Sequence, residues 1–196
     1  MLDVECTFRV ARAGDAAAIV ELVNCANSGA GGTAGWTHEA NYFEGKRTDI
    51  REILDLYADP GSAFVLCMEG EELVGCAYLK RIRSAAYMGL LSVRPTLQAR
   101  GIGSKIIAEC ERVARREWHC PTMQISVITS HRPEVTAFYE RRGYARTGRL
   151  KTFERKNARL APGVTGLVLE WLEKPLAGTP SPSLAQRPKP EPTIAR

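Results

Sequence analysis

Two short segments of this chain carry residue types and spacings suited to binding a phosphate group and to moving a proton. The first, residues 98–104, reads Gln-Ala-Arg-Gly-Ile-Gly-Ser, follows an apolar run that ends at Pro95, and precedes a long amphipathic stretch. Backbone N–H groups at the start of a helix lack intrahelical acceptors, and the helix dipole favours an anion beside them. The segment therefore predicts a phosphate site made of backbone amides.

The spacing of the glycines excludes two common phosphate loops. The dinucleotide fingerprint needs a third glycine at position 106, which is isoleucine, and the Walker loop needs lysine directly after its last glycine, whereas Gly103 is followed by serine. The pattern that does fit is Gln/Arg-x-x-Gly-x-Gly/Ala, met by Gln98, Gly101 and Gly103. A plain strand-to-helix turn is the alternative interpretation of this glycine pair taken alone.

The second segment, residues 132–144, carries an aromatic pair on a short predicted helix. It reads Arg-Pro-Glu-Val-Thr-Ala-Phe-Tyr-Glu-Arg-Arg-Gly-Tyr and begins about thirty residues after the glycine pair. Pro133 suits a helix start and Gly143 suits a helix end. Taken alone, Phe138 and Tyr139 would be interpreted as core aromatics, since most aromatic side chains bury area.

Together the two segments resemble the paired signatures of the GCN5-related N-acetyltransferase (GNAT) family, and the likeness extends over roughly residues 7–174. The resemblance implies one α/β domain over that range, with a mixed, mostly antiparallel twisted sheet splayed around the cofactor strand and helices on both faces. It also implies direct transfer of an acetyl group from acetyl-CoA, the co-substrate, to a primary amine in a ternary complex. No metal is expected.

The resemblance also assigns roles by position. Tyr139 takes the place of the family's general acid, which protonates the sulfur of the leaving coenzyme A. The strand before the loop is expected to hold the pantetheine arm, with the amide of Leu91 polarising the thioester carbonyl. The residues implied in cofactor binding are Leu91, Ser92, Val93, Gln98, Ala99, Arg100, Gly101, Ile102, Gly103, Ser104 and Arg132.

The chain departs from the family pattern at two places. Arg132 stands where many members have an asparagine that contacts the coenzyme, and no acid lies between Tyr87 and Ser92, where many members place a glutamate base. An amine that is already neutral needs no base, and the missing acid leaves open an acyl-CoA-binding sensor or interaction module with little or no turnover. By chemistry alone, the candidates for the base are His38, Glu39, His131 and Glu134.

The acceptor is expected to contact the segment between the first two helices, which in this family forms one wall of the acceptor site. The residues implied are Trp36, His38, Glu39 and Phe43. The aromatic and acidic content of residues 36–44 favours a small cationic amine over a protein, while amino acids, polyamines, drugs and protein amines all stay open. A homodimer also stays open, because dimers are common among relatives.

Composition and charge exclude several other classes of protein. The chain has 196 residues, of which 44% are hydrophobic and 25% charged, as is usual for one globular domain. Its six cysteines form no Cys-x-x-Cys pair and are expected to be core residues, and its three histidines are too scattered for a zinc site.

The net charge of +5 is spread over several clusters without a nucleic-acid-binding motif, so nucleic acid is kept only as a minor alternative partner. No apolar run is long enough for a membrane span and no signal peptide is recognisable, which predicts a cytoplasmic protein without membrane contact.

The periodicity of apolar residues predicts the elements that position these segments. Strands are expected over residues 7–11, 63–68, 73–79, 87–93, 122–128 and 167–172. Helices are expected after a cap at Asp15, after a cap at Thr48 or Asp49, from residue 102 to about 118, and from Pro133. Residues 175–196 are rich in proline and are expected to form a disordered tail.

Overall fold

The computed structural model describes residues 6–28, 42–130, 133–153 and 159–176. Its strands are β1 (Thr7–Val10), β2 (Phe43–Glu44), β3 (Ser62–Glu69), β4 (Glu72–Ile82), β5 (Ala85–Val93), β6 (Thr122–Ile128), β7 (Ala145–Thr152), β8 (Arg159–Leu160) and β9 (Val168–Pro175). Its helices are α1 (Ala16–Ser28), α2 (Ile50–Ala58), α3 (Ile102–Arg116) and α4 (Pro133–Glu140), with 3-10 turns at Ala13–Asp15 and Pro95–Leu97.

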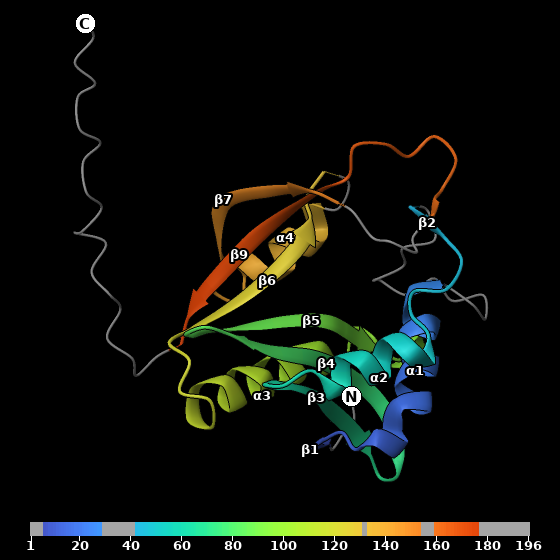
Figure 1. Ribbon diagram of the computed structural model, residues 1–196, viewed down its shortest axis with the longest axis vertical. Coiled ribbons are helices and arrows are strands. Elements are labelled where there is room, and N and C mark those ends of the chain that lie inside the picture. Colours follow the sequence, from blue (N-terminus) through green and yellow to red (C-terminus); the bar gives the residue numbers. More distant parts are fainter. Residues whose placement is uncertain (1–5, 29–41, 131–132, 154–158, 177–196) are drawn as a thin grey trace, which may run out of the picture.

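Seven strands form one mixed sheet in the order β1-β3-β4-β5-β6-β9-β7 (Figure 1). Within the described residues, β5 and β6 are the one parallel pair of this sheet, and the other neighbours run antiparallel. Strands β2 and β8 pair separately, Phe43 with Leu160. This arrangement confirms the mixed, mostly antiparallel α/β fold expected from the sequence.

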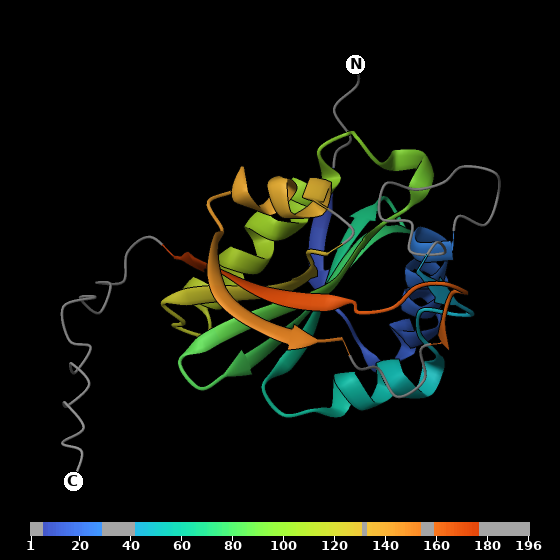
Figure 2. The ribbon, with the colours of Figure 1, turned by 90° about the horizontal axis from the view of Figure 1, so that it is seen from above.

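Helices cover both faces of the sheet (Figure 2). Alternate side chains of β3 point to opposite faces, so that Val65 and Cys67 join the core under α3 while Phe64 and Leu66 join the core under α1 and α2. The predicted apolar face of α3 is confirmed, since Ile102, Ile106, Cys110, Val113 and Ala114 are all buried. Asp49 caps α2, as predicted, by accepting from the amide of Glu52.

The sheet divides where β5 meets β6. The two strands pair only over Ala85–Tyr87 and Thr122–Gln124, after which β6, β9 and β7 diverge from the other half (Figure 1). Just beyond that pairing, β5 carries a bulge, in which Leu90 and Leu91 together lie opposite Ala77 of β4. Leu90 adopts a left-handed backbone conformation, with φ of 50°, which few branched residues adopt. The bulge lies at the mouth of the opening between the two halves.

One sequence-based expectation was wrong, and one strand was not predicted. Asp15 does not cap α1. It is the last residue of the 3-10 turn Ala13–Asp15, and its carboxylate accepts hydrogen bonds from the backbone amide of Arg12 and from the Arg9 guanidinium. Strand β7 was not predicted, because every one of its residues is exposed and apolar residues do not alternate along it. Backbone pairing with β9, rather than burial of side chains, stabilises β7.

Four of the six cysteines are buried, in agreement with the expectation that they are core residues. These are Cys67, Cys76, Cys110 and Cys120, and none of the six forms a disulfide in the structure. Within the described residues no cluster of three potential metal ligands occurs. No helix in the described part of the chain has both the length and the apolar character needed to cross a membrane.

Candidate active site

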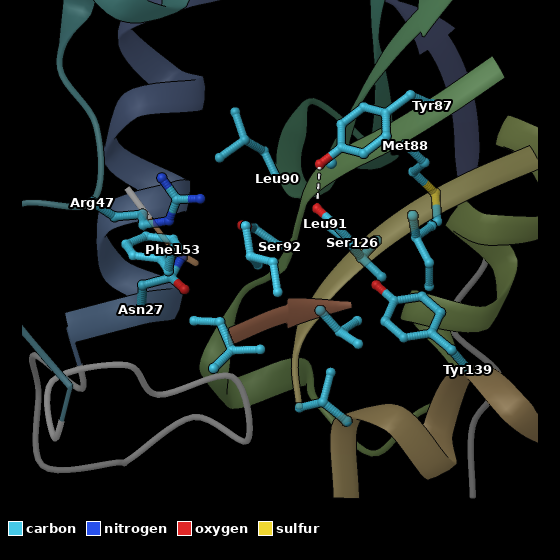
Figure 3. Close-up of a pocket in the computed structure, with 16 residues that line it drawn as sticks. Asn27, Arg47, Tyr87, Met88, Leu90, Leu91, Ser92, Ser126, Tyr139 and Phe153 are labelled. Atoms are coloured by element: carbon cyan, nitrogen blue, oxygen red, sulfur yellow. Dashed lines mark hydrogen bonds between the residues drawn. The ribbon is translucent and has the colours of Figure 1, made fainter. Parts of the chain in front are cut away.

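Two cavities meet at Leu91, on the bulge of β5. The first, here called the tyrosine cavity because Tyr139 lines it, has a volume of about 270 Å³ and lies in the opening between β5 and β6 (Figure 3). The second, here called the loop cavity because residues 97–99 and 101–104 line it, has a volume of about 560 Å³ and lies beside the start of α3. Leu91 lines both, so the bulge lies between a cavity beside the start of α3 and a cavity that contains the motif tyrosine.

The loop cavity is built around the glycine pair found in the sequence. The side-chain amide of Gln98 donates to the carbonyl of Val93 at 3.0 Å, which ties the loop to the end of β5. Ala99 and Gly101 both adopt left-handed backbone conformations, and Gly101 is the residue directly before α3. These two conformations turn the chain sharply enough to start α3 against the cavity.

The first turn of α3 supplies backbone donors to this cavity. The first backbone bond of the helix is made by the N–H of Lys105 to the carbonyl of Gly101 at 3.1 Å. The N–H groups of Ile102, Gly103 and Ser104 therefore lack intrahelical acceptors, and all three residues line the loop cavity. Amides in this position favour an anion such as a pyrophosphate.

Gly103 is a place where the fold itself does not require glycine. A Cβ at this position would meet the side chains of Phe138 at 3.8 Å and Val93 at 3.9 Å, which are ordinary van der Waals contacts. The backbone dihedrals at Gly103 are helical, so no positive φ demands glycine either. Because glycine has no side chain, a ligand in the loop cavity can come close to the backbone at Gly103.

Arg142 adds a cation to the loop cavity. Its guanidinium stacks on the ring of Phe138, 3.5 Å from the centroid, donates to the carbonyl of Phe138 at 2.7 Å, and donates to the hydroxyl of Ser104. Burial lowers the pKa of Arg142, and Arg141 beside it adds to that effect. Arg142 was not predicted at the site; the spacing of four residues between Phe138 and Arg142 is the signal that could have identified the pair.

Tyr139 reaches the tyrosine cavity from α4. Its ring packs edge-on against Phe138, with centroids 5.2 Å apart, and against the buried ring of Tyr144 at 5.6 Å. Figure 3 shows its hydroxyl pointing into the cavity, on the side where the hydroxyl of Tyr87 bonds Ser126 at 2.9 Å. Burial raises the pKa of Tyr139 above its usual value, so the phenol keeps its proton into the alkaline range.

Most of the residues expected in cofactor binding come together at these cavities. Arg100 is an exception, being exposed and outside both sets of lining residues. Those that line the tyrosine cavity are Leu91 and Ser92. Those that line the loop cavity are Leu91, Val93, Gln98, Ala99, Gly101, Ile102, Gly103 and Ser104.

The residues expected at the acceptor wall are placed only in part. Phe43 does not line the tyrosine cavity; its ring lies 5.0 Å from that of Phe153, which does. Trp36, His38 and Glu39 lie outside the described residues, as does Arg132, which was expected in cofactor binding. Asn27, Arg47 and Phe153 line the cavity and were not predicted, because they come from three separate segments that share no motif.

No base is found on the described walls of the tyrosine cavity. Glu134 is exposed in the first turn of α4 and is not among the lining residues. His38, Glu39 and His131 lie outside the described residues. The described walls supply hydroxyls, apolar side chains, one amide and one guanidinium, but neither a carboxylate nor an imidazole.

Comparison with known proteins agrees with this geometry. The sequence model of the acetyltransferase (GNAT) family matches residues 32–144. Among solved structures, the chain is similar to the ribosomal-protein-S18-alanine N-acetyltransferase of Escherichia coli, with 11% identity and a TM-score of 0.62 over 88% of this chain and 94% of that chain. It is also similar to yncA of Salmonella typhimurium, solved with acetyl-CoA, with 20% identity and a TM-score of 0.61 over 91% of this chain and 98% of that chain.

A third similar structure is a spermidine N-acetyltransferase SpeG chimera from Vibrio cholerae and hSSAT. It is 17% identical, with a TM-score of 0.63 over 87% of this chain and 95% of that chain. No curated protein matches the sequence significantly. At these identities the solved structures establish the shared fold, and the two that are described by an acceptor differ in it.

Proposed function

The chain belongs to the GNAT acetyltransferase family, and we propose that it transfers an acetyl group from acetyl-CoA to a primary amine by direct attack in a ternary complex. The observation that carries the proposal is the meeting of the two cavities at Leu91. A ligand with a pyrophosphate at one end and a thioester at the other fits such a pair, with the reacting end beside Tyr139.

The loop cavity would hold the coenzyme through backbone amides and one cation. The N–H groups of residues 102–104 and the guanidinium of Arg142 face the same chamber, so they act together on an anion. The pantetheine arm would then follow β5 past Val93 toward Leu91. An acyl thioester placed there supplies an electrophilic carbonyl carbon and a thiol leaving group.

Two groups of the chain would act on the reacting atoms. The amide of Leu91, on the bulge, would donate to the carbonyl oxygen as negative charge develops on it. Tyr139 would deliver its proton to the departing sulfur as the carbon–sulfur bond breaks, while the attacking amine loses a proton to water. Burial keeps the Tyr139 phenol protonated until the bond breaks, and the raised pKa also makes it a weaker acid, so its contribution depends on being positioned at the sulfur.

A steady-state assay tests the proposal. Release of free thiol from acetyl-CoA is measured against a panel of primary amines for the wild type and for Tyr139→Phe. We expect the substitution to lower kcat by about 10²-fold or more with little change in KM for acetyl-CoA, because it removes a proton donor but no binding contact. Tyr57→Phe is the matched control, since Tyr57 is exposed on α2. An unchanged kcat for Tyr139→Phe contradicts the general-acid role.

An acyl-CoA-binding module without turnover is the second candidate. The described walls of the tyrosine cavity lack a carboxylate or imidazole, and this observation favours it. Calorimetric titration with coenzyme A separates the two functions. Tight coenzyme binding together with no thiol release for any amine identifies the binding module.

A further inference from the structure

A pair of hydroxyl groups joins the two halves of the sheet at the point where they separate. Tyr87 of β5 and Ser126 of β6 share a hydrogen bond of 2.9 Å, and both residues line the tyrosine cavity (Figure 3). The backbone pairing of the two strands ends at Tyr87 and Gln124, so this bond lies directly beyond it. The two hydroxyls are therefore held together inside the opening between β5 and β6.

The hydroxyl pair and Tyr139 approach the cavity from opposite faces of the sheet. Met88 of β5 and Val127 of β6 belong to the core under α3, and Tyr139 packs against that same core. Successive side chains of a strand point to opposite faces, so Tyr87 and Ser126, each next to one of these residues in sequence, lie on the other face. The face opposite the proposed proton donor is thus the one that carries the hydroxyl pair.

The ring of Tyr87 lies along its own strand in the direction of the bulge. A Cβ at Gly89 would come within 3.1 Å of the Tyr87 Cε1 atom and 3.4 Å of its hydroxyl oxygen, so the ring covers the backbone at Gly89. A larger residue there would press on the ring. The Tyr87 hydroxyl consequently lies beside residue 89, nearer to Leu91 than the start of its own side chain does.

The hydroxyl pair keeps part of its hydrogen-bonding capacity. Each hydroxyl has one hydrogen to donate and two lone pairs that accept, and the bond between Tyr87 and Ser126 uses one of each. The pair can therefore accept a hydrogen bond from an N–H group in the cavity. Since neither hydroxyl carries a charge, it suits a neutral amine, which is the form that attacks a thioester.

We propose that the Tyr87–Ser126 pair orients the acceptor by accepting a hydrogen bond from the attacking amine. The inference rests on the proposed acetyl transfer and names the residues that position the nucleophile for it. With one N–H held by the pair, the nitrogen lone pair faces the thioester carbon beside Leu91. The carbon–nitrogen bond then forms and the carbon–sulfur bond breaks. Tyr139 protonates the sulfur, the nitrogen gives its surplus proton to water, and Tyr139 regains a proton from water.

Steady-state kinetics of two variants that each lack one hydroxyl test the pair. With the best amine of the panel, Tyr87→Phe and Ser126→Ala should each lower kcat/KM for the amine by about tenfold or more, because the nucleophile loses its orientation. The dissociation constant for coenzyme A should stay unchanged. The loss in the double variant should be smaller than the product of the two single losses, because each hydroxyl fixes the position of the other. Ser126→Thr keeps a hydroxyl and should recover most of the rate.

Gly89→Ala tests the position of the hydroxyl without removing it. The added methyl group should displace the Tyr87 ring and lower kcat/KM for the amine, again without weakening coenzyme binding. An unchanged kcat/KM in Tyr87→Phe and Ser126→Ala overturns the proposal. So does a fall in kcat/KM that is matched by an equal loss of coenzyme affinity, since that result would show general damage to the site.

A structural control separates orientation of the amine from support of the sheet. Gln124 donates to Glu173 at 2.8 Å and so joins β6 to β9, and it is not among the described residues that line the tyrosine cavity. Gln124→Met should therefore lower the melting temperature while kcat/KM stays at the wild-type value. If Tyr87→Phe behaves in the same way as Gln124→Met, the hydroxyl pair only supports the sheet and the proposal fails.

A binding measurement makes the inference independent of turnover. The protein saturated with coenzyme A is titrated by calorimetry with benzylamine and with n-butylamine, at an alkaline pH where both amines are largely neutral. Binding that is weaker in Tyr87→Phe and in Ser126→Ala than in the wild type supports the orienting pair even if no thiol is released, in which case only the proposed transfer fails. Equal binding by the three proteins, or no binding of either amine, contradicts the orienting pair.

Discussion

The guanidinium of Arg142 donates to the hydroxyl of Ser104, and this contact joins the residues that follow α4 to the first turn of α3. The two elements carry the two sequence motifs, so the contact is where the motifs meet in space. Ser104 also contributes an amide without an intrahelical acceptor, which places an anion-binding donor and a cation on the same wall. An incoming phosphate would meet both.

Replacing Arg142 should weaken coenzyme binding. We expect Arg142→Met to raise the dissociation constant for coenzyme A by about 10- to 100-fold, since a charge-assisted contact with a phosphate is lost. Calorimetric titration measures this change directly, and Arg142→Lys should recover part of it. Arg116→Met, at the far end of α3 and exposed, is the control. Undiminished affinity in Arg142→Met would exclude this guanidinium from the coenzyme site.

Gly103→Ala should separate folding from binding. Alanine at this position meets only ordinary contacts and favours the helix by up to about 1 kcal/mol, so the melting temperature should stay level or rise. Its methyl group would face Phe138 and Val93 at the edge of the loop cavity, where it should weaken coenzyme binding by about tenfold or more. Thermal melting and calorimetry check the two effects. A variant that binds coenzyme A as tightly as the wild type would show that no ligand approaches this backbone closely.

Sequence reasoning identified most of the elements because their side chains alternate or repeat against a core. The strands around Phe64 and Tyr78 are continuous apolar runs buried on both faces, and the helix from Ile102 has a buried face with the helical period. Strand β7 could not be found this way, since its position depends on backbone pairing with β9 and its side chains remain exposed. Local patterns contain no information about such a pairing.

The same limit applies to the site. The glycine loop and the segment that contains Tyr139 are each a continuous stretch of sequence, so each could be recognised as a motif. The structure brings them to two cavities that share Leu91. Arg47 and Phe153 reach the tyrosine cavity from segments more than a hundred residues apart in sequence, so their proximity follows from the tertiary fold alone. That Arg47 and Phe153 line the same cavity was therefore not predictable from the sequence around either residue.

The ion pair beside the first helix should control stability at low pH. Asp15 accepts two hydrogen bonds of 2.7 Å from Arg9, and these lower the pKa of Asp15 to about 2. Because the folded-state pKa lies below the unfolded value, the stabilisation is fully present above about pH 4 and is lost as the pH falls toward 2. Since the Arg9 side chain is 40% exposed, we expect Asp15→Asn to cost only about 1 kcal/mol at pH 7.

Urea denaturation of the wild type and Asp15→Asn at several pH values measures that difference. The two free energies of unfolding should converge between pH 4 and pH 2, and Asp55→Asn, with Asp55 exposed on α2, should track the wild type throughout. A gap between wild type and Asp15→Asn that stays constant down to pH 2 would show that the charge of Asp15 contributes nothing.

The raised pKa of Tyr139 makes a prediction about alkaline pH. A tyrosine in water loses its proton near pH 10, whereas burial keeps Tyr139 protonated beyond that point. Because the protonated form is the one that donates to the departing sulfur, kcat should show no alkaline fall up to about pH 10. The rate should instead rise with pH as more of the acceptor amine becomes neutral, since the described cavity walls offer no carboxylate or imidazole to act as base.

Two acceptors whose amines differ in pKa distinguish the acceptor from the enzyme as the source of this rise. The midpoint of the rise in kcat/KM should move with the pKa of the acceptor, and Tyr139→Phe should lower the whole profile without moving that midpoint. A midpoint that stays fixed for both acceptors would instead identify an ionising group of the protein as the base. A fall in kcat between pH 8 and pH 10 that is absent in Tyr139→Phe would show that the phenol ionises in this range, contrary to the effect of its burial.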